Sequence, residues 1–303
     1  MTASFSTGID AISLWRDDLR SGRRPEIIEH QFEQPLLIPG HVCLVGGAPG
    51  AGKTAFITQC IVESLRMNPE KRALIANCEM SPAALLDRQL SRLSGVPAET
   101  IRHRRLTARH KERIDAGIET LESIAERIAF LDSPFSLDNV ASTAHAHAAD
   151  IIVIDYVQRF TAPGKETESR ARVAKVMDDL RRFASLGLVV IALSAVGRSK
   201  DEKGRSSYGG AGLNLASFRE SSELEFGADD AFILAPVADN KPGTLILKHL
   251  KCRHGKPTDL HLRFDRKHQD FSIRAARDEA DIEEQEAHDY PRWENTRPTR
   301  TGE

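Results

Sequence analysis

The segment VCLVGGAPGAGKTAFI, residues 42–57, decides the fold of this chain. Its apolar first part is typical of a buried β-strand, its glycine-rich centre of a tight loop, and its last part of a helix that runs to about Arg66. Residues 47–54 satisfy the pattern G-x-x-x-x-G-K-[ST] in full, between the strand and the helix that this pattern requires. A glycine-rich turn before an ordinary helix is the alternative, and the complete motif disfavours it.

Each residue type in this loop suits a phosphate chain. Gly47, Gly50 and Gly52 are expected to adopt positive φ, so that successive N–H groups point at one anion. The helix N-terminus adds partial positive charge. Lys53 is expected to contact the β- and γ-phosphates, and Thr54 to bind Mg²⁺. The motif therefore predicts an ATP–Mg²⁺ site made of Gly47, Ala48, Pro49, Gly50, Ala51, Gly52, Lys53, Thr54 and Ala55.

Length and charge set the domain organisation that we expect. A chain of 303 residues could hold two domains, but its motifs follow one another from Gly47 to Arg253, which favours one large α/β domain. We predict an extension with a candidate linker helix over residues 1–34, an ATPase domain over 35–275, and a charged, disordered tail over 276–303. Residues 278–289 are acidic and contain no Lys or Arg. The net charge of −2 neither favours nor excludes a polyanionic partner.

Cysteine usage and hydropathy predict the compartment. The four cysteines form no C-x-x-C pair, which favours reduced structural thiols over disulfides or zinc. The N-terminus lacks a hydrophobic signal core, and no apolar run approaches the length of a membrane span. We therefore expect a cytoplasmic protein that does not contact a membrane.

The N-terminal segment has helical spacing of apolar residues over 10–19. This pattern predicts a short helix. The helix would dock either on a neighbouring subunit or on its own domain, and the sequence leaves both open.

Two acidic residues end predicted strands. Residues 73–78 predict a buried strand that presents Glu79, and residues 150–156 predict another that presents Asp155. In an open parallel sheet such positions face the ligand crevice. Asp155 then matches the Walker B acid that holds Mg²⁺, with a capping Asp as the weaker alternative. Glu79 would deprotonate the attacking water, or would equally well be an acid near the start of the helix after Pro82.

The rest of the chain continues the α/β pattern. We predict helical structure over 83–130, a strand over 128–131, a helix over 170–186, and strands over 188–193 and 231–235. Residues 245–250 and 260–264 are expected to pair as a hairpin. The polar loop 199–214 is a candidate contact for single-stranded DNA, because it supplies charge for phosphates and a ring for stacking: Lys200, Lys203, Arg205 and Tyr208.

Several stretches together resemble the motor domain of the DnaB-type replicative helicases, a branch of the RecA-like ATPases. The phosphate loop alone is generic, and the other motifs are more specific. In order over residues 35–270, they are 47–54, 77–81, 152–158, 190–194 with Arg198, 218–221 with Glu225, Ala228 and Asp229, and 251–255.

The resemblance implies a fold, partners and residue roles. The fold would be an α/β, RecA-like P-loop NTPase with a mostly parallel central sheet flanked by helices and a C-terminal β-hairpin. Partners would be ATP, Mg²⁺, single-stranded DNA, further copies in a hexameric ring, and a replication or loader protein. Glu79 would be the catalytic base, and Lys251 and Arg253 would reach a neighbour's γ-phosphate. Arg219, Glu220 and Ser222 would contact DNA.

Three departures from the family pattern qualify this resemblance. Ala195 stands where the family usually has a glutamine that senses the γ-phosphate, and Ser222 replaces a usual glycine in the DNA loop. Only 46 residues precede the phosphate loop, so we expect the family's N-terminal domain to be absent. The leading hypothesis is an ATP-dependent helicase or translocase motor. The alternative is an ATPase switch that binds DNA or a partner protein without unwinding.

Overall fold

The computed structural model describes residues 7–22, 26–32, 34, 36–161, 169–197, 199–200, 206–207, 214–218, 224, 226–237 and 242–274. Only the backbone is described for residues 169–170, 199–200 and 206–207. The predicted tail, most of the loop 199–214, and the predicted DNA contacts Arg219, Glu220 and Ser222 lie outside this part of the chain.

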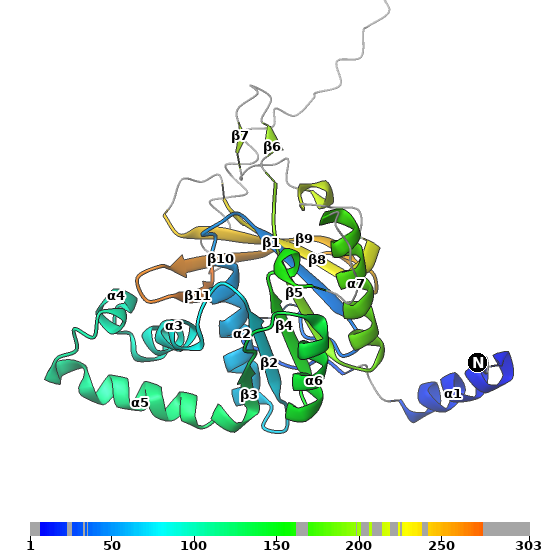
Figure 1. The fold of residues 1–303 in the computed structure, drawn as a ribbon, viewed down its shortest axis with the longest axis horizontal. Helices are drawn as coiled ribbons and strands as arrows, with labels where there is room; N and C mark the ends of the chain where they lie inside the picture. Colours follow the sequence, from blue (N-terminus) through cyan, green and yellow to red (C-terminus); the bar gives the residue numbers. More distant parts are fainter. Residues whose placement is uncertain are drawn as a thin grey trace, which may run out of the picture.

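One mixed sheet organises the described part of the chain (Figure 1). Its strand order is β11-β10-β9-β8-β1-β5-β4-β2-β3, and neighbours from β8 to β3 pair in parallel. The parallel strands are β1 (Val42–Gly47), β2 (Ala73–Asn77), β3 (Ile128–Phe130), β4 (Ile151–Asp155), β5 (Val189–Ala195) and β8 (Asp230–Pro236). This arrangement confirms the predicted fold class.

The central strands are buried on both faces because helices cover both sides of the sheet. Alternate residues of β1 therefore belong to two different cores: Cys43 and Val45 pack with α2 (Lys53–Met67), and Val42 and Leu44 pack with the opposite face. That opposite face is covered by α6 (Leu137–His147) and α7 (Ser169–Ser185). All of β4 is buried, as its apolar run predicts.

The region predicted as helical over 83–130 is interrupted. It contains α3 (Pro82–Ser94), α4 (Ala98–Arg102) and α5 (Lys111–Glu122). Helix α3 begins at an N-cap serine, Ser81, whose hydroxyl accepts the N–H of Ala84, and it ends at Gly95 with a left-handed φ of 63°. These caps set where α3 begins and ends, and because the helix begins shortly after β2 ends at Asn77, it starts next to the crevice at the C-terminal ends of the strands.

The C-terminal strands are antiparallel. Strand β9 (Thr244–Cys252) pairs with β8 and with β10 (Leu260–Asp265), which confirms the predicted hairpin. A further strand, β11 (Asp270–Ile273), pairs with β10 and was not predicted. A two-stranded ribbon, β6 (Ser199–Lys200) with β7 (Ser206–Ser207), lies within the polar loop.

One helix was not expected from the sequence, and for another the sequence leaves two alternatives open. Helix α6 was not predicted, because its sequence LDNVASTAHAH offers only Leu137, Val140 and Ala144 to the core. Helix α1 (Gly8–Ser21) has no buried residue, so it does not pack on the described domain, and Figure 1 shows it apart from the sheet. No described helix has the length and apolar character needed to span a membrane.

Candidate nucleotide-binding and catalytic site

The phosphate loop connects β1 to α2, and its glycines meet two different steric requirements. Gly50 and Gly52 have φ values of 73° and 100°, as predicted. Gly47 is not among the described glycines with positive φ, so that prediction was wrong for this residue. Gly47 is needed for another reason: a Cβ atom there would lie 2.9 Å from the carbonyl oxygen of Leu234 on β8.

Lys53 lies inside this loop. Its Nζ atom donates hydrogen bonds to the carbonyl oxygens of Gly47 at 2.8 Å and of Ala48 at 3.2 Å. Burial lowers the pKa of Lys53, and the carboxylates of Asp155 and Glu79 oppose that shift. The ammonium group is therefore a desolvated cation held where the motif predicts the phosphates.

Asp155 is the centre of the polar network at the end of the parallel strands. Its Oδ2 atom accepts hydrogen bonds of 2.6 Å from the Thr54 hydroxyl and 2.6 Å from the Asn77 side-chain amide. Burial raises the pKa of Asp155, the Thr54 hydroxyl opposes this, and Glu79 adds to it. A hydroxyl and a carboxylate at this spacing form an oxygen donor set that suits Mg²⁺.

Asn77 joins the two acids of the site. Besides its bond to Asp155, it accepts the backbone N–H of Glu79 at 2.9 Å and of Met80 at 2.8 Å on its Oδ1 atom. It thereby fixes the turn that carries Glu79. Sequence reasoning gave Asn77 no role, although a polar residue at the end of a buried strand was the available signal.

Six of the predicted nucleotide-binding residues line one cavity of about 480 Å³: Pro49, Gly50, Gly52, Lys53, Thr54 and Asp155. The other four predicted residues are not in its lining: Gly47, Ala48, Ala51 and Ala55. Lys53, Thr54, Glu79 and Asp155 all line it, which brings together residues from the loop, β2 and β4. The turn between β10 and β11 forms another wall, which sequence reasoning did not anticipate. In that turn Arg266 donates to the carbonyl oxygen of Gly50 at 2.9 Å.

The other two predicted catalytic residues lie elsewhere. Lys251 and Arg253 are at the end of β9, where Lys251 pairs with Ala231 and the backbone N–H of Arg253 bonds to Asp229. This is the start of β1, near Val42, whereas the phosphate loop leaves the other end of β1. These two ends of β1 are five residues apart, which corresponds to about 16 Å along the strand. The structure does not bring Lys251 and Arg253 to the cavity of their own chain.

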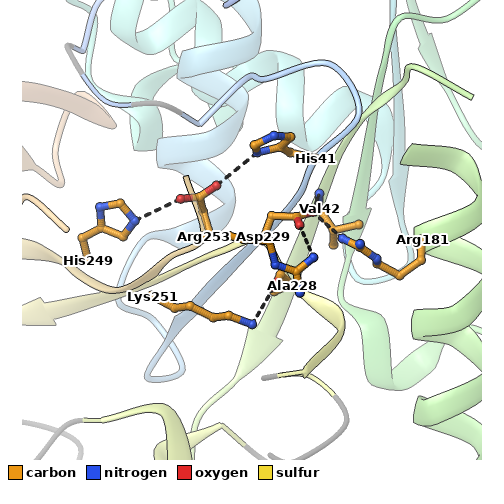
Figure 2. Close-up of polar contacts among 9 residues, drawn as sticks. His41, Val42, Arg181, Ala228, Asp229, His249, Lys251 and Arg253 are labelled. Carbon is orange, nitrogen blue, oxygen red and sulfur yellow. Dashed lines mark hydrogen bonds and ion pairs between the residues drawn. The ribbon is translucent and has the colours of Figure 1, made fainter. Parts of the chain in front are cut away.

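Asp229 holds Arg253 in place (Figure 2). Arg253 donates to Oδ1 of Asp229 at 2.8 Å, while Oδ2 accepts from Arg181 and, at 2.9 Å, from the backbone N–H of Val42. Although burial opposes it, these donors hold the pKa of Asp229 below its usual range. Lys251 donates to the carbonyl oxygen of Ala228 at 2.7 Å.

Both carboxylate oxygens of the neighbouring acid, Asp230, also have hydrogen-bond partners. Asp230 contacts His249 at 3.2 Å and His41 at 3.4 Å, and Cys252 lies within the same cluster. The Nδ1 atom of His249 accepts the N–H of Thr258, so the proton on Nε2 faces Asp230. This tautomer makes His249 a hydrogen-bond donor to the carboxylate, and the cluster anchors the end of β9.

Comparison with known sequences gives consistent matches. Residues 37–273 match the family described as DnaB-like helicase C terminal domain. The chain is 24% identical over 242 residues to a probable plasmid replicative DNA helicase of Chlamydia trachomatis serovar L2. The matched region covers 78% of this chain and 51% of that protein. The chain is also 27% identical over 203 residues to replicative DNA helicase DnaB of Buchnera aphidicola, with 64% and 42% covered. The chain therefore spans about half the length of the curated relatives it matches.

Solved structures share the fold. The ATPase domain of G40P superposes with a TM-score of 0.75 at 18% identity and covers 89% of this chain and 100% of that one. A DnaB-like replicative helicase, solved in a study of its interactions with primase, gives a TM-score of 0.72 at 18% identity, with 90% and 68% covered. At this identity the comparison shows the fold alone.

Proposed function

Because the chain belongs to the DnaB-like helicase C-terminal domain family, we propose that it is an ATP-hydrolysing motor that moves on single-stranded DNA and unwinds duplexes. The proposed active form is a ring of identical chains, six by the family resemblance. ATP and Mg²⁺ are the proposed nucleotide and cation. A replication or loader protein remains a proposed partner.

The observation that carries this proposal is that the charged residues lie in two groups, at opposite ends of the central strands. Lys53, Glu79 and Asp155 line one cavity, and Lys251 and Arg253 lie at the other end of the central strands. The side chain of Arg253 keeps 39% of its surface exposed although it is bound to Asp229. A second copy that places its β9 end against this cavity would add the missing cations.

Each residue then has a part in phosphoryl transfer to water. Glu79, held by Asn77, orients the water and accepts its proton as the oxygen attacks in line. Lys53 and the Arg253 of the second copy balance the charge that develops on the phosphoryl oxygens. An arginine supplied in this way contributes about 10³–10⁵ in rate in other phosphoryl-transfer systems. Mg²⁺, held by Thr54 and Asp155, would neutralise charge on the β- and γ-phosphates.

Helix α1 supplies a second contact between copies in this proposal. Ile12, Trp15 and Leu19 recur at helical spacing and remain 52%, 62% and 63% exposed. The described domain has an apolar groove of about 360 Å³ between α3, α5 and the β2–β3 edge, with Leu86 and Ile118 in its lining. We assign this groove to α1 of a second copy. In Figure 1, α1 lies away from α3 and α5 of its own chain.

The proposed DNA contacts follow β5 and precede β8. They are Lys200, Lys203, Arg205, Arg219, Glu220 and Ser222. Since Ala195 at the end of β5 lines the nucleotide cavity, the segment after β5 starts beside the nucleotide. This continuity supports a coupling between hydrolysis and contact with DNA.

Mixing two inactive variants tests the shared site. Lys53→Ala removes the cation of the phosphate loop, and Arg253→Ala removes the cation offered to the neighbour. Each variant alone should lose ATP hydrolysis, and their mixture should regain part of it, because some interfaces combine an intact loop with an intact Arg253. Hydrolysis that survives in Arg253→Ala alone would contradict the proposal.

One observation favours a second function, a nucleotide-dependent switch that binds DNA without unwinding it. The methyl side chain of Ala195 lines the nucleotide cavity at the position where the family usually has the glutamine sensor. Alanine cannot form the hydrogen bond that would report the γ-phosphate to the DNA-contacting segment. Strand displacement on a forked substrate separates the two functions: hydrolysis stimulated by single strands without displacement would support the switch.

A further inference from the structure

Gly46 is the residue of β1 directly before the phosphate loop, and an aromatic ring packs against it. A Cβ atom at Gly46 would lie 2.5 Å from Cε1 of Phe218 and 3.0 Å from Cγ1 of Val196. Because strand residues alternate between the two faces, Gly46 faces the core that α6 and α7 cover, where Phe218 and Val196 are each 2% exposed. Glycine at this position therefore leaves the room that the ring of Phe218 occupies.

The two residues that contact Gly46 also contact each other. Val196 and Phe218 form an antiparallel bridge, beside which the N–H of Gly197 donates to the carbonyl oxygen of Ser217 at 2.7 Å. Both groups of proposed DNA contacts are attached to the chain at this bridge. One group follows Val196 and the other follows Phe218: Lys200, Lys203 and Arg205, and then Arg219, Glu220 and Ser222.

The same bridge is joined to the nucleotide site from two sides. Val196 follows Ala195, which lines the nucleotide cavity. Gly46 precedes Gly47, whose carbonyl oxygen accepts the hydrogen bond of 2.8 Å from Lys53. A close-packed interior leaves little space that could absorb a small displacement. A shift of the phosphate loop that moves Gly46 would therefore displace the ring of Phe218.

We propose that Phe218 is a positioning residue that transmits the state of the phosphate loop to the DNA-contacting segments through its contact with Gly46. This inference rests on the proposed function and deepens it. It applies to a motor and to a switch alike, because both require contact with DNA that depends on the nucleotide. Ala195 lacks the polar side chain that the family usually places there, and the packing of Phe218 against Gly46 supplies a link that needs no hydrogen bond.

The test measures the affinity of the full chain for a fluorescent single-stranded oligonucleotide, once with a non-hydrolysable ATP analogue and once with ADP, both with Mg²⁺. The ratio of the two affinities reports the coupling between the nucleotide and DNA sites. Phe218→Leu should lower this ratio about fivefold or more, because the shorter side chain loses its contact with Gly46. Hydrolysis of ATP without DNA should stay within about twofold of the unsubstituted chain, because Phe218 lies outside the catalytic residues.

Phe160→Leu is the matched control. Phe160 is also buried in the core that α6 and α7 cover, but it packs against Phe135. The control removes the same atoms from the same core, so it should lower the melting temperature to a similar extent and leave the ratio of affinities unchanged.

Gly46→Ala tests the contact from its other side. Alone it should lower the melting temperature, because its Cβ atom would lie 2.5 Å from the ring of Phe218. Combined with Phe218→Leu it should destabilise the chain less than the two single effects added together, since the smaller side chain makes room for the methyl group. The methyl group should also restore part of the ratio of affinities that Phe218→Leu loses.

Three outcomes would count against the inference. An unchanged ratio in Phe218→Leu would show that the ring transmits nothing, and an equal fall in Phe160→Leu would show a general loss of packing. Additive effects of Gly46→Ala and Phe218→Leu would show that the two positions act independently. Each of these outcomes would leave the proposed function standing. Failure of the unsubstituted chain to bind single-stranded DNA with either nucleotide would overturn the proposed function and this inference with it.

Discussion

Asn77 donates a hydrogen bond of 2.6 Å from its side-chain amide to Oδ2 of Asp155. The other end of the same amide holds the backbone of Glu79, so one side chain sets the spacing between the acid proposed to bind the cation and the acid proposed to activate water. The strands that precede Glu79 and contain Asp155 do not by themselves set this spacing.

Asn77→Ala should therefore reduce the rate of ATP hydrolysis more than it reduces nucleotide binding. Loss of positioning at a general base predicts a fall in kcat of about 10–100-fold, because Glu79 would leave the geometry of attack. Steady-state kinetics at saturating ATP would measure this. The control is Ser81→Ala, which removes the N-cap of α3 but no bond to Asp155. A kcat within twofold of the unsubstituted value would contradict the positioning role.

Asp155→Asn should stabilise the chain and inactivate it. Burial raises the pKa of Asp155 in the folded state, so the ionised carboxylate costs stability at pH values above that raised pKa, and the cost disappears as the carboxyl protonates at lower pH. The asparagine keeps an oxygen for the Thr54 hydroxyl without the charge. We expect a gain of about 1 kcal/mol at pH 7 without nucleotide, together with loss of hydrolysis.

Thermal unfolding at pH 7 and at pH 4 would test this prediction. The difference in stability between Asp155→Asn and the unsubstituted chain should shrink at the lower pH. A substituted chain that melts at a lower temperature at pH 7 would show that the carboxylate stabilises the fold, contrary to the burial argument.

Asp229→Asn should have the opposite dependence on pH. The Val42 N–H, Arg181 and Arg253 hold the folded-state pKa of Asp229 below its usual range, so the ionised carboxylate stabilises the fold above the unfolded-state pKa of about 3.9. That contribution is lost as the pH falls through the lower folded-state pKa. Removing the charge should cost about 2 kcal/mol at pH 7, because two charge-assisted hydrogen bonds weaken.

Urea unfolding at pH 7 and pH 3 would measure this difference, with Asp179→Asn as a control at the ion pair that Asp179 forms with the exposed Arg182 on α7. Asp179→Asn should change stability by less than about 0.5 kcal/mol. An Asp229→Asn effect no larger than the control's would contradict the role of Asp229 as an anchor for Arg253.

Trp15→Ser combined with Ile12→Asp should prevent assembly without unfolding the domain. Both side chains are more than half exposed in the isolated chain, so their replacement removes no described core contact. Light scattering with ATP and Mg²⁺ should then give the mass of a single chain. Asp17→Ser, on the opposite face of α1, should assemble normally, and Ile118→Asp in the groove should reproduce the defect. Normal assembly of both interface variants would exclude this contact.

The amino-acid sequence by itself determined the parts of this protein that depend on short stretches of chain. Apolar runs such as 151–154 specify buried parallel strands, because successive side chains point to opposite faces of the sheet and both faces are covered. The glycines and Lys53 of the phosphate loop specify their site because they are contiguous. Helix α6 was not predicted because its pattern of apolar residues is weak. Which side of this helix faces the core becomes clear only from its packing against the sheet.

Only the tertiary structure decided which polar and charged residues meet. Asn77, Arg88 and Arg266 lie on three different elements, and the fold alone brings them around the loop that Lys53 marks. Because β9 runs antiparallel to β8, Arg253 lies at the opposite end of the strands from Lys53, beside the start of β1. Strand direction and register set that separation, and neither can be read from the spacing of residues along the chain.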